Sequence, residues 1–264
     1  MKKYFTLSKV AFMATLVNRF HLFAMFITNI AYIIITYFLW KAIYASNQGV
    51  NSVMEFESTF VYLALSSCIY YVFQSWVEYD LSGAMINGNV AVDLTKPYDL
   101  QRYWFYRILG FAICKLLMIG VPSVVVIICM VKGKFLVGPQ LLIGCFSLIM
   151  SYVISLNMDY IAGLVSFYTQ SVWGVCLVKE TLVLLLSGMS VPIAFFPKAI
   201  GEVVKMLPFS SMFNTPMTIM LSKSMPAGEI GKFLGIQFFW ACGIYFLAKL
   251  FYRHCLNHTI INGG

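Results

Sequence analysis

Few side chains in this chain of 264 residues are of a type that does chemistry. His254 and His258 stand four positions apart, which places two imidazoles on one face of a helix, where a pair of histidines can hold zinc. The glutamate that a metalloprotease needs beside the first histidine is missing, and both histidines belong to a C-terminal tail. We therefore expect no metal site and no catalytic residue.

Two glycines have the spacing of a phosphate-binding loop without its chemistry. Gly83 and Gly88 match the two ends of a P-loop, but Asn89 and Val90 stand where Lys and Ser or Thr must follow. The Ser-Gly pairs at 82–83 and 187–188 carry no nucleotide-binding meaning without that loop. The chain has no recognisable device for binding ATP.

Lys115 and Asp159 are the clear ionisable groups inside apolar segments, where a buried charge is costly and therefore a functional candidate. Lys115 could extend its ammonium group to the membrane surface. Asn157 and Tyr160 accompany Asp159, which suggests an intramembrane polar site at Asn157 and Asp159 or simply a contact between helices. A proton relay would need more such groups.

The composition is that of an integral membrane protein. Hydrophobic residues make up 61% of the chain and charged residues 11%, whereas a soluble domain has about 25% charged residues. The net charge of +8 is scattered at the ends of apolar segments, where it sets topology and contacts anionic lipid rather than nucleic acid. Seven cysteines without a C-x-x-C pair are expected to be small buried side chains. We expect one all-α membrane domain over residues 1–264.

A helix that crosses a bilayer needs about 20 mostly apolar residues. Six segments come close to this length and composition, and they are the predicted spans: Phe20–Tyr44, Thr59–Val77, Ile108–Val131, Leu141–Phe167, Val178–Ile193 and Phe233–Phe251. Before them, residues 1–19 are predicted to form an amphipathic helix in the membrane interface, because apolar side chains recur there at helical spacing. The aromatic residues near the span ends are typical of an interfacial belt. A role in stacking against the substrate stays open for some of them.

Basic residues before the first span favour a cytoplasmic N-terminus, and six spans then return the C-terminus to the cytoplasm. Four lysines oppose this trend, because they would lie outside: Lys132, Lys134, Lys198 and Lys205. Residues 78–107 form a polar cytoplasmic connection, with a short helix expected at Leu81–Met85 and a turn at Lys96–Pro97.

The stretch Leu186–Pro216 is the most informative part of the chain. Gly188 and Pro192 are predicted to end one apolar helix, and a short amphipathic helix is predicted to begin at Pro197 and to end before Pro208. That helix is too short to cross a bilayer. Broken helices at membrane depth need a cavity lined by protein or water around their freed backbone groups, so this outer region, residues 194–228, indicates a transport path.

The order of these residues resembles a known family. Ser-Gly at 187–188, Pro192, Phe-Phe-Pro at 195–197 and Leu-Pro-Phe at 207–209, followed by a later proline, are similar to the signature of ABC-2-type transporter permeases. Within it they resemble the six-span branch that includes bacterial drug and antimicrobial-peptide exporters. The Asp-Leu-Thr-Lys-Pro sequence at 93–97 resembles the cytoplasmic loop of the family. One departure from the family pattern is Tyr168, because a Phe-Trp pair is expected at positions 167–168.

The resemblance implies a dimer with a second permease chain, identical or a paralogue, and a separate nucleotide-binding ATPase that holds ATP and magnesium. Residues 1–19 would be the elbow helix and 78–107 the coupling region, whose contacts with the ATPase would be Leu81, Gly83, Met85, Lys96 and Pro97. The outer region would be re-entrant, and its gate residues would be Pro192, Phe195, Phe196, Pro197, Pro208 and Phe209.

The resulting expectation is a permease subunit in a bacterial cell membrane that exports a hydrophobic or amphipathic compound, such as a peptide antibiotic, a drug or a lipid-like molecule. The alternative is a stand-alone secondary transporter or channel, which would need more intramembrane charge than Asp159 supplies. An intramembrane enzyme ranks last, because no paired acid and base groups are visible.

Overall fold

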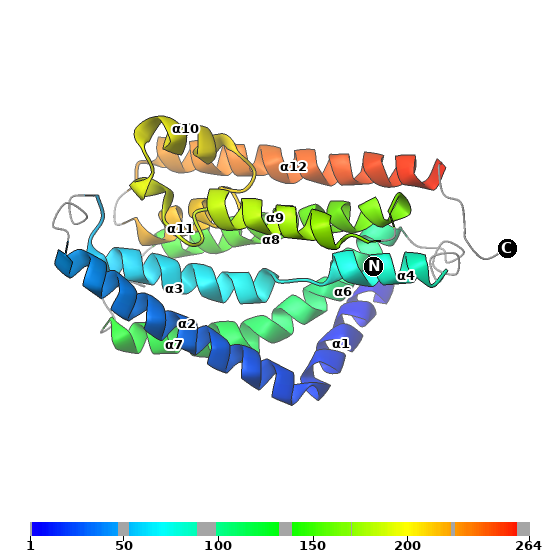
Figure 1. Ribbon diagram of the computed structural model, residues 1–264, viewed down its shortest axis with the longest axis horizontal. Helices are drawn as coiled ribbons and strands as arrows, with labels where there is room; N and C mark the ends of the chain where they lie inside the picture. Colours follow the sequence, from blue (N-terminus) through cyan, green and yellow to red (C-terminus); the bar gives the residue numbers. More distant parts are fainter. Residues whose placement is uncertain are drawn as a thin grey trace.

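The computed structural model describes residues 2–46, 53–88, 99–131, 139–169, 171–222 and 225–257, and these residues contain helices and no strand (Figure 1). The long helices are α2 (Arg19–Ser46), α3 (Phe56–Phe73), α6 (Leu100–Lys115), α8 (Pro139–Leu164) and α12 (Ala227–Asn257). The other helices are α1 (Lys2–Val17), α4 (Val77–Ile86), α7 (Val121–Met130), α9 (Trp173–Leu186), α10 (Lys198–Met206) and α11 (Asn214–Leu221). The predictions made at Lys96, Pro97, Lys132, Lys134 and His258 concern residues that lie outside the described ones.

Five helical stretches in the described residues are long and apolar enough to span a membrane: Arg19–Ser46, Phe56–Ile86, Leu100–Met130, Gln140–Phe167 and Ala227–Leu256. The prediction of a fifth span at Val178–Ile193 is wrong, because the helix at this place, α9, has only 14 residues. Its length of about 21 Å falls short of the roughly 30 Å of a hydrocarbon core. The helix ends at Leu186, seven residues earlier than predicted, because the backbone turns at Gly188 with φ of +81°.

The chain nevertheless passes back and forth six times. In Figure 1, α2, α3, the α6–α7 pair, α8, α9 and α12 alternate in direction between the two ends of the molecule. The start of α1, the end of α12 and α4 lie at one end, and α10 and α11 lie at the other. The segment 187–213 therefore covers the remaining distance from the end of α9 to this end of the molecule.

Two of the long passes are interrupted. The helix α3 ends at Phe73, and residues Gln74–Trp76 are unwound. The helix α4 then continues in the direction of α3, and it contains the short helix expected at Leu81–Met85. The third pass begins at Leu100, eight residues before the predicted start, and contains a π-helical turn at Leu116–Gly120 just before Pro122. Because proline has no N–H to donate, a widened turn at this point is a common accommodation.

Polar side chains join the passes inside the apolar bundle. Asn29 of α2 is fully buried; its Nδ2 donates to Ser123 Oγ of α7 at 2.9 Å, and its Oδ1 accepts from Ser67 Oγ of α3 at 3.0 Å. Such small and amide side chains hold helices together where lipid offers no hydrophobic driving force. This network was not predicted from the sequence.

The N-terminal helix α1 packs closely on α6. Ser8 Oγ donates to the carbonyl oxygen of Tyr106 at 2.6 Å, and the rings of Tyr4 and Tyr106 stack with centroids 5.1 Å apart. The buried face of α1 is formed by Ser8 and Ala11, while Phe5 of the predicted apolar stripe is exposed. The helix therefore exists as predicted, but it rests on protein through its small residues.

Gly110 permits this approach, since a Cβ there would overlap the carbonyl oxygen of Ser8. We predict that Gly110→Ala separates α1 from α6 and lowers the stability of the purified protein by about 1–3 kcal/mol. Thermal unfolding in detergent measures the effect.

Gly235→Ala is the matched control, because this glycine also lies in a helix but has open space around it. Both changes add the same intrinsic helix propensity. Equal melting temperatures of the two variants would contradict the close-packing role of Gly110.

Candidate functional site

The unwound residues between α3 and α4 are held by side chains of two other passes. The carbonyl oxygen of Gln74 accepts a hydrogen bond from Lys115 Nζ at 2.6 Å, and Ser75 Oγ donates to Asp159 Oδ2 at 2.6 Å. Lys115 is 7% exposed, so it does not extend to the membrane surface as expected. Its charge instead stabilises a backbone carbonyl that the helix break leaves without a helical partner.

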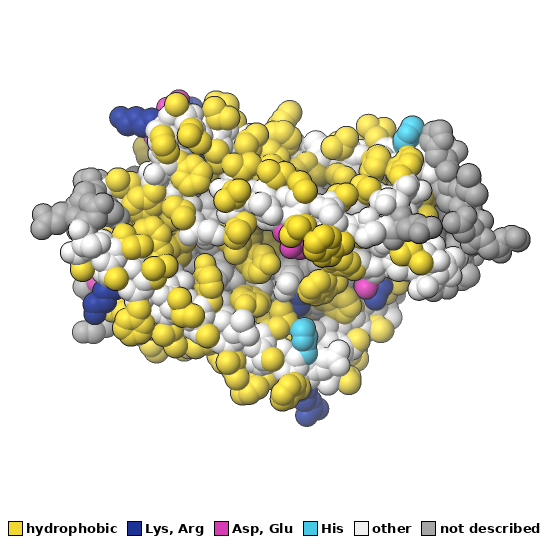
Figure 2. All heavy atoms as spheres, in the orientation of Figure 1, with side chains coloured by type: hydrophobic (Ala, Val, Ile, Leu, Met, Phe, Trp, Pro, Cys, Tyr) yellow, Lys and Arg dark blue, Asp and Glu magenta, His cyan; other side chains and the backbone are white. Residues whose placement is uncertain are grey.

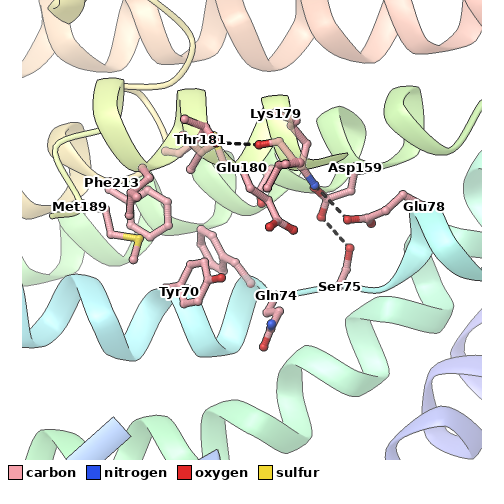
Figure 3. Close-up of a pocket in the computed structure, with 16 residues that line it drawn as sticks. Tyr70, Gln74, Ser75, Glu78, Asp159, Lys179, Glu180, Thr181, Met189 and Phe213 are labelled. Atoms are coloured by element: carbon pink, nitrogen blue, oxygen red, sulfur yellow. Dashed lines mark hydrogen bonds and ion pairs between the residues drawn. The ribbon is translucent and has the colours of Figure 1, made fainter. Parts of the chain in front are cut away.

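Lys179 of α9 holds two carboxylates from two other helices. Its Nζ lies 2.6 Å from Asp159 Oδ1 on α8 and 3.0 Å from Glu78 Oε1 on α4 (Figure 3). Asp159 and Glu78 are 7% and 1% exposed. Each pair has charge-assisted hydrogen-bond geometry, and together they tie α4, α8 and α9 at one point.

Only Asp159 of this ionic cluster was identified from the sequence. Glu78 was predicted to lie in a polar connection, although it is the second residue of α4 and is buried. Lys179 stands with Glu180 at the start of the predicted fifth span, and an adjacent pair of charges within an apolar run was the signal that could have found it.

Asn157 and Asp159 do not form one polar site. The side chain of Asn157 accepts a hydrogen bond from Gln101 Nε2 of α6 at 2.8 Å, and Gln101 also reaches the carbonyl oxygen of Tyr245 in α12. Two positions along a helix turn by about 200°, so the two side chains point to opposite sides of α8. Gln101 and Asn157 join α6, α8 and α12, whereas Asp159 joins α8 to α9 and to Ser75 in the unwound link before α4.

A pocket of about 350 Å³ lies beside the ionic cluster, between α3, α8 and α9. Glu78, Asp159, Lys179 and Glu180 line one part of it, and its other walls are mainly apolar. The apolar lining consists of Tyr70, Phe73, Leu177, Val183, Leu184, Met189, Met212 and Phe213. The volume and the mixture of apolar walls with a few charged groups are those of a site for a small molecule.

The segment 187–213, which we name the outer segment after the position predicted for this part of the chain, follows α9 directly and borders the same pocket through Met189, Met212 and Phe213. Gly188 turns the chain, and a Cβ there would meet Tyr62 Oη at 2.8 Å. The helix α10 spans Lys198–Met206, which confirms the predicted short helix. Its stripe is split, because Val204 is buried while Val203 is exposed.

Gln237 of α12 satisfies the non-helical backbone of this segment. Its Nε2 donates to the carbonyl oxygen of Ser211 at 2.9 Å and to Ser151 Oγ at 2.8 Å, and its Oε1 accepts from Ser147 Oγ at 2.7 Å. Ser151 Oγ also donates to the Ser211 carbonyl oxygen. The requirement for partners around a broken helix at membrane depth is thus met by protein side chains.

The predicted gate residues differ in exposure. Pro192 is buried, Pro197 is exposed, and the other four are partly buried. The ring of Phe195 lies 5.4 Å from that of Trp40 on α2, and Trp240 of α12 donates to the Met206 carbonyl oxygen at 2.8 Å. The segment is therefore held on two sides by side chains of other passes.

The predicted coupling residues differ in exposure. Leu81 is 1% exposed and packs near Gly163 of α8, so it is not open to a soluble partner as we had expected. Gly83 and Met85 are partly buried, and the accessible end of α4 is Ile86, which is 61% exposed. Leu81 belongs to the core because α4 lies along α8 rather than projecting from the bundle.

Comparison with known families decides the identity. Residues 11–263 match the family described as "ABC-2 family transporter protein". The chain belongs to this ABC-2 transporter family. No curated protein and no solved structure matches the chain.

As an ABC-2 family protein, the chain is the membrane component of a transporter. Permeases of this family lack a nucleotide-binding domain and generally pair with an ATPase subunit. The five candidate spans agree with a multi-pass membrane protein. ABC-2 membership favours ATP-driven transport over a stand-alone secondary transporter. Among the residues that the structure describes, no group of three or more His, Cys, Asp or Glu could hold a metal ion.

We predict that Lys179→Met destabilises this ABC-2 protein by about 3–5 kcal/mol, because it leaves two buried carboxylates without their cation. Adding Glu78→Gln and Asp159→Asn to Lys179→Met should recover a large part of the loss. Thermal unfolding of the single and triple variants in detergent measures both effects.

Lys232→Met controls for the loss of a lysine, since Lys232 is exposed on α12 and in no ion pair within the described chain. A melting temperature of Lys179→Met equal to that of Lys232→Met would contradict the role of the ionic cluster.

Proposed function

We propose that the chain is the membrane-spanning subunit of an ATP-binding-cassette exporter in a bacterial cell membrane. It moves a hydrophobic or amphipathic compound out of the cell, and a separate ATPase chain binds ATP and magnesium. The permease works as a dimer with a second copy or a paralogue. The observation that carries the proposal is a continuous connection from α4, at one end of the bundle, to the outer segment at the other.

The connection has two steps. Glu78 of α4 is paired with Lys179 of α9, so a displacement of α4 acts on α9 through a buried ion pair. The helix α9 then leads into the outer segment through Ser187, whose carbonyl oxygen accepts from Asn214 N at 3.1 Å. A push on α4 is thereby transmitted to the segment that closes the opposite end, as rigid-body switching requires.

We infer the direction of the molecule in the membrane from the same arrangement. In this proposal the end with α4, the start of α1 and the end of α12 is cytoplasmic, so the ATPase contacts α4 and the loop that follows it. The basic residues Lys2, Lys3 and Lys9 support this orientation, because such residues favour the cytoplasmic side. The outer segment then faces the cell exterior.

We predict that Ile86→Glu weakens association with the ATPase by about tenfold or more, because it places a charge in an apolar contact. The test is co-expression with candidate ATPases, followed by pull-down in detergent. Val53→Glu is the control, as Val53 is an exposed apolar residue just before α3, and α3 begins at the end opposite α4.

If no nucleotide-binding protein associates with the wild-type chain, the proposal fails. If Ile86→Glu and Val53→Glu behave alike, the ATPase does not bind at α4.

Transport in proteoliposomes separates the proposal from its alternative. The complex should move a hydrophobic cargo only when ATP is supplied, and Lys179→Met with Glu78→Gln should reduce this movement more than it reduces ATP hydrolysis. Cargo movement driven by an ion gradient in ATP-free liposomes, without an ATPase, would instead support a secondary transporter.

A further inference from the structure

The pocket beside the ionic cluster has an excess of acidic groups. Glu78, Asp159 and Glu180 line it, and Lys179 is the one basic side chain among the described residues that does so. Lys179 is occupied by Glu78 and Asp159. Lys115 is bound to the Gln74 carbonyl oxygen and does not line the pocket.

Glu180 is the carboxylate that Lys179 does not hold. Figure 3 shows its side chain turned away from the ionic cluster, into the space between α9 and α3 where Tyr70 lies. Among the described residues, no hydrogen bond or ion pair joins its carboxylate to another side chain. In Figure 2 acidic atoms lie amid hydrophobic side chains where α9 crosses the middle of the face.

A second and independent feature lies deeper in the pocket. Glu78 is 1% exposed, and while its Oε1 contacts Lys179, its Oε2 has no hydrogen-bond partner. A buried carboxylate oxygen without a donor is costly, and in a native site an ion, a water molecule or a ligand group can supply the partner. Both acidic features therefore point to a positive charge in the same pocket.

The walls decide what kind of cation fits. Tyr70, Phe73 and Phe213 are aromatic residues of the lining, and aromatic rings attract organic ammonium groups. Met189 and Met212 provide flexible side chains that adapt to irregular apolar shapes. A small inorganic ion would leave these walls without contacts, whereas a cation with an apolar body would cover them. The volume of about 350 Å³ is at the lower end of drug-sized sites.

We propose that this pocket binds a monovalent organic cation with an apolar body, and that Glu180 recognises its charge. The inference rests on the proposed function in one respect, since it names the chemical class of the cargo. The same carboxylates disfavour two other classes of compound. They would repel an amphipathic anion, and they would form no ionic contact with a neutral lipid.

The test compares two ions of matched shape and opposite charge, tetraphenylphosphonium and tetraphenylborate. Equilibrium binding of each is measured on the full chain in nanodiscs of zwitterionic lipid, with binding to empty nanodiscs subtracted. We expect saturable binding of the cation and none of the anion. Glu180→Gln should weaken binding of the cation roughly five- to tenfold, because it removes one exposed charge and its contacts.

Glu229→Gln is the matched control, because Glu229 is an exposed carboxylate at the start of α12 and does not line the pocket. Leu184→Trp is a second variant that fills the pocket without changing charge, and it should also weaken binding of the cation. Melting temperatures of all three variants establish that they are folded.

Equal binding of the two ions, or cation binding that neither Glu180→Gln nor Leu184→Trp changes, would overturn the inference. The proposed function is tested separately, because this assay contains no ATPase. Cation binding by a chain that recruits no ATPase would support the proposed pocket and contradict the proposed exporter. Association with an ATPase without charge-selective binding would support the exporter and contradict the pocket.

Discussion

Lys179 is the point on which the arrangement of the helices depends. It stands on α9, the shortest of the six passes, and holds carboxylates of α4 and α8 at 3.0 and 2.6 Å. In a membrane interior a lone ammonium group or a lone carboxylate is expensive, so none of the three charges is stable without the others. The ionic cluster therefore decides where α9 lies, and through α9 it decides where the outer segment begins.

The same constraint explains how two non-helical stretches, Gln74–Trp76 and the outer segment, are held within the bundle. Lipid provides no hydrogen bonds, so every break in a helix must be matched by a polar side chain from a neighbour. Lys115 supplies this for the break at Gln74, and Gln237 supplies it for the outer segment at Ser211. The two devices differ in character, since a charge holds the inner break and a neutral amide holds the outer one.

These features suggest how a short helix serves a transporter. Because α9 does not span the bilayer, the segment after it is held by side-chain contacts with Gln237, Trp40 and Trp240 rather than by a continuous helical backbone. Side-chain contacts can be exchanged singly, whereas unwinding a helix breaks many bonds together. An outer segment of this construction can move while the long passes stay intact, and the pocket that borders it would change shape with that movement.

Much of the fold could be predicted from the sequence because apolar length is a strong signal in membrane proteins. The long passes and the helix between Pro197 and Pro208 were predicted correctly, apart from their boundaries. The predicted fifth span was too long, because an apolar run that continues past Gly188 resembles a helix in hydropathy although its backbone turns away. The burial of Leu81 was missed for the opposite reason, since charges beside it resemble a solvated connection.

The sequence by itself determined that this is an all-helical membrane protein with a broken outer region, and its residue order determined the family. These properties depend on local apolarity and on prolines and glycines, which act within a few residues of themselves. Only the tertiary structure decided that Glu78, Asp159 and Lys179 meet, and that Asn157 turns to another side of its helix. Such meetings depend on the rotation and depth of helices far apart in the chain, and hydropathy carries no information about either.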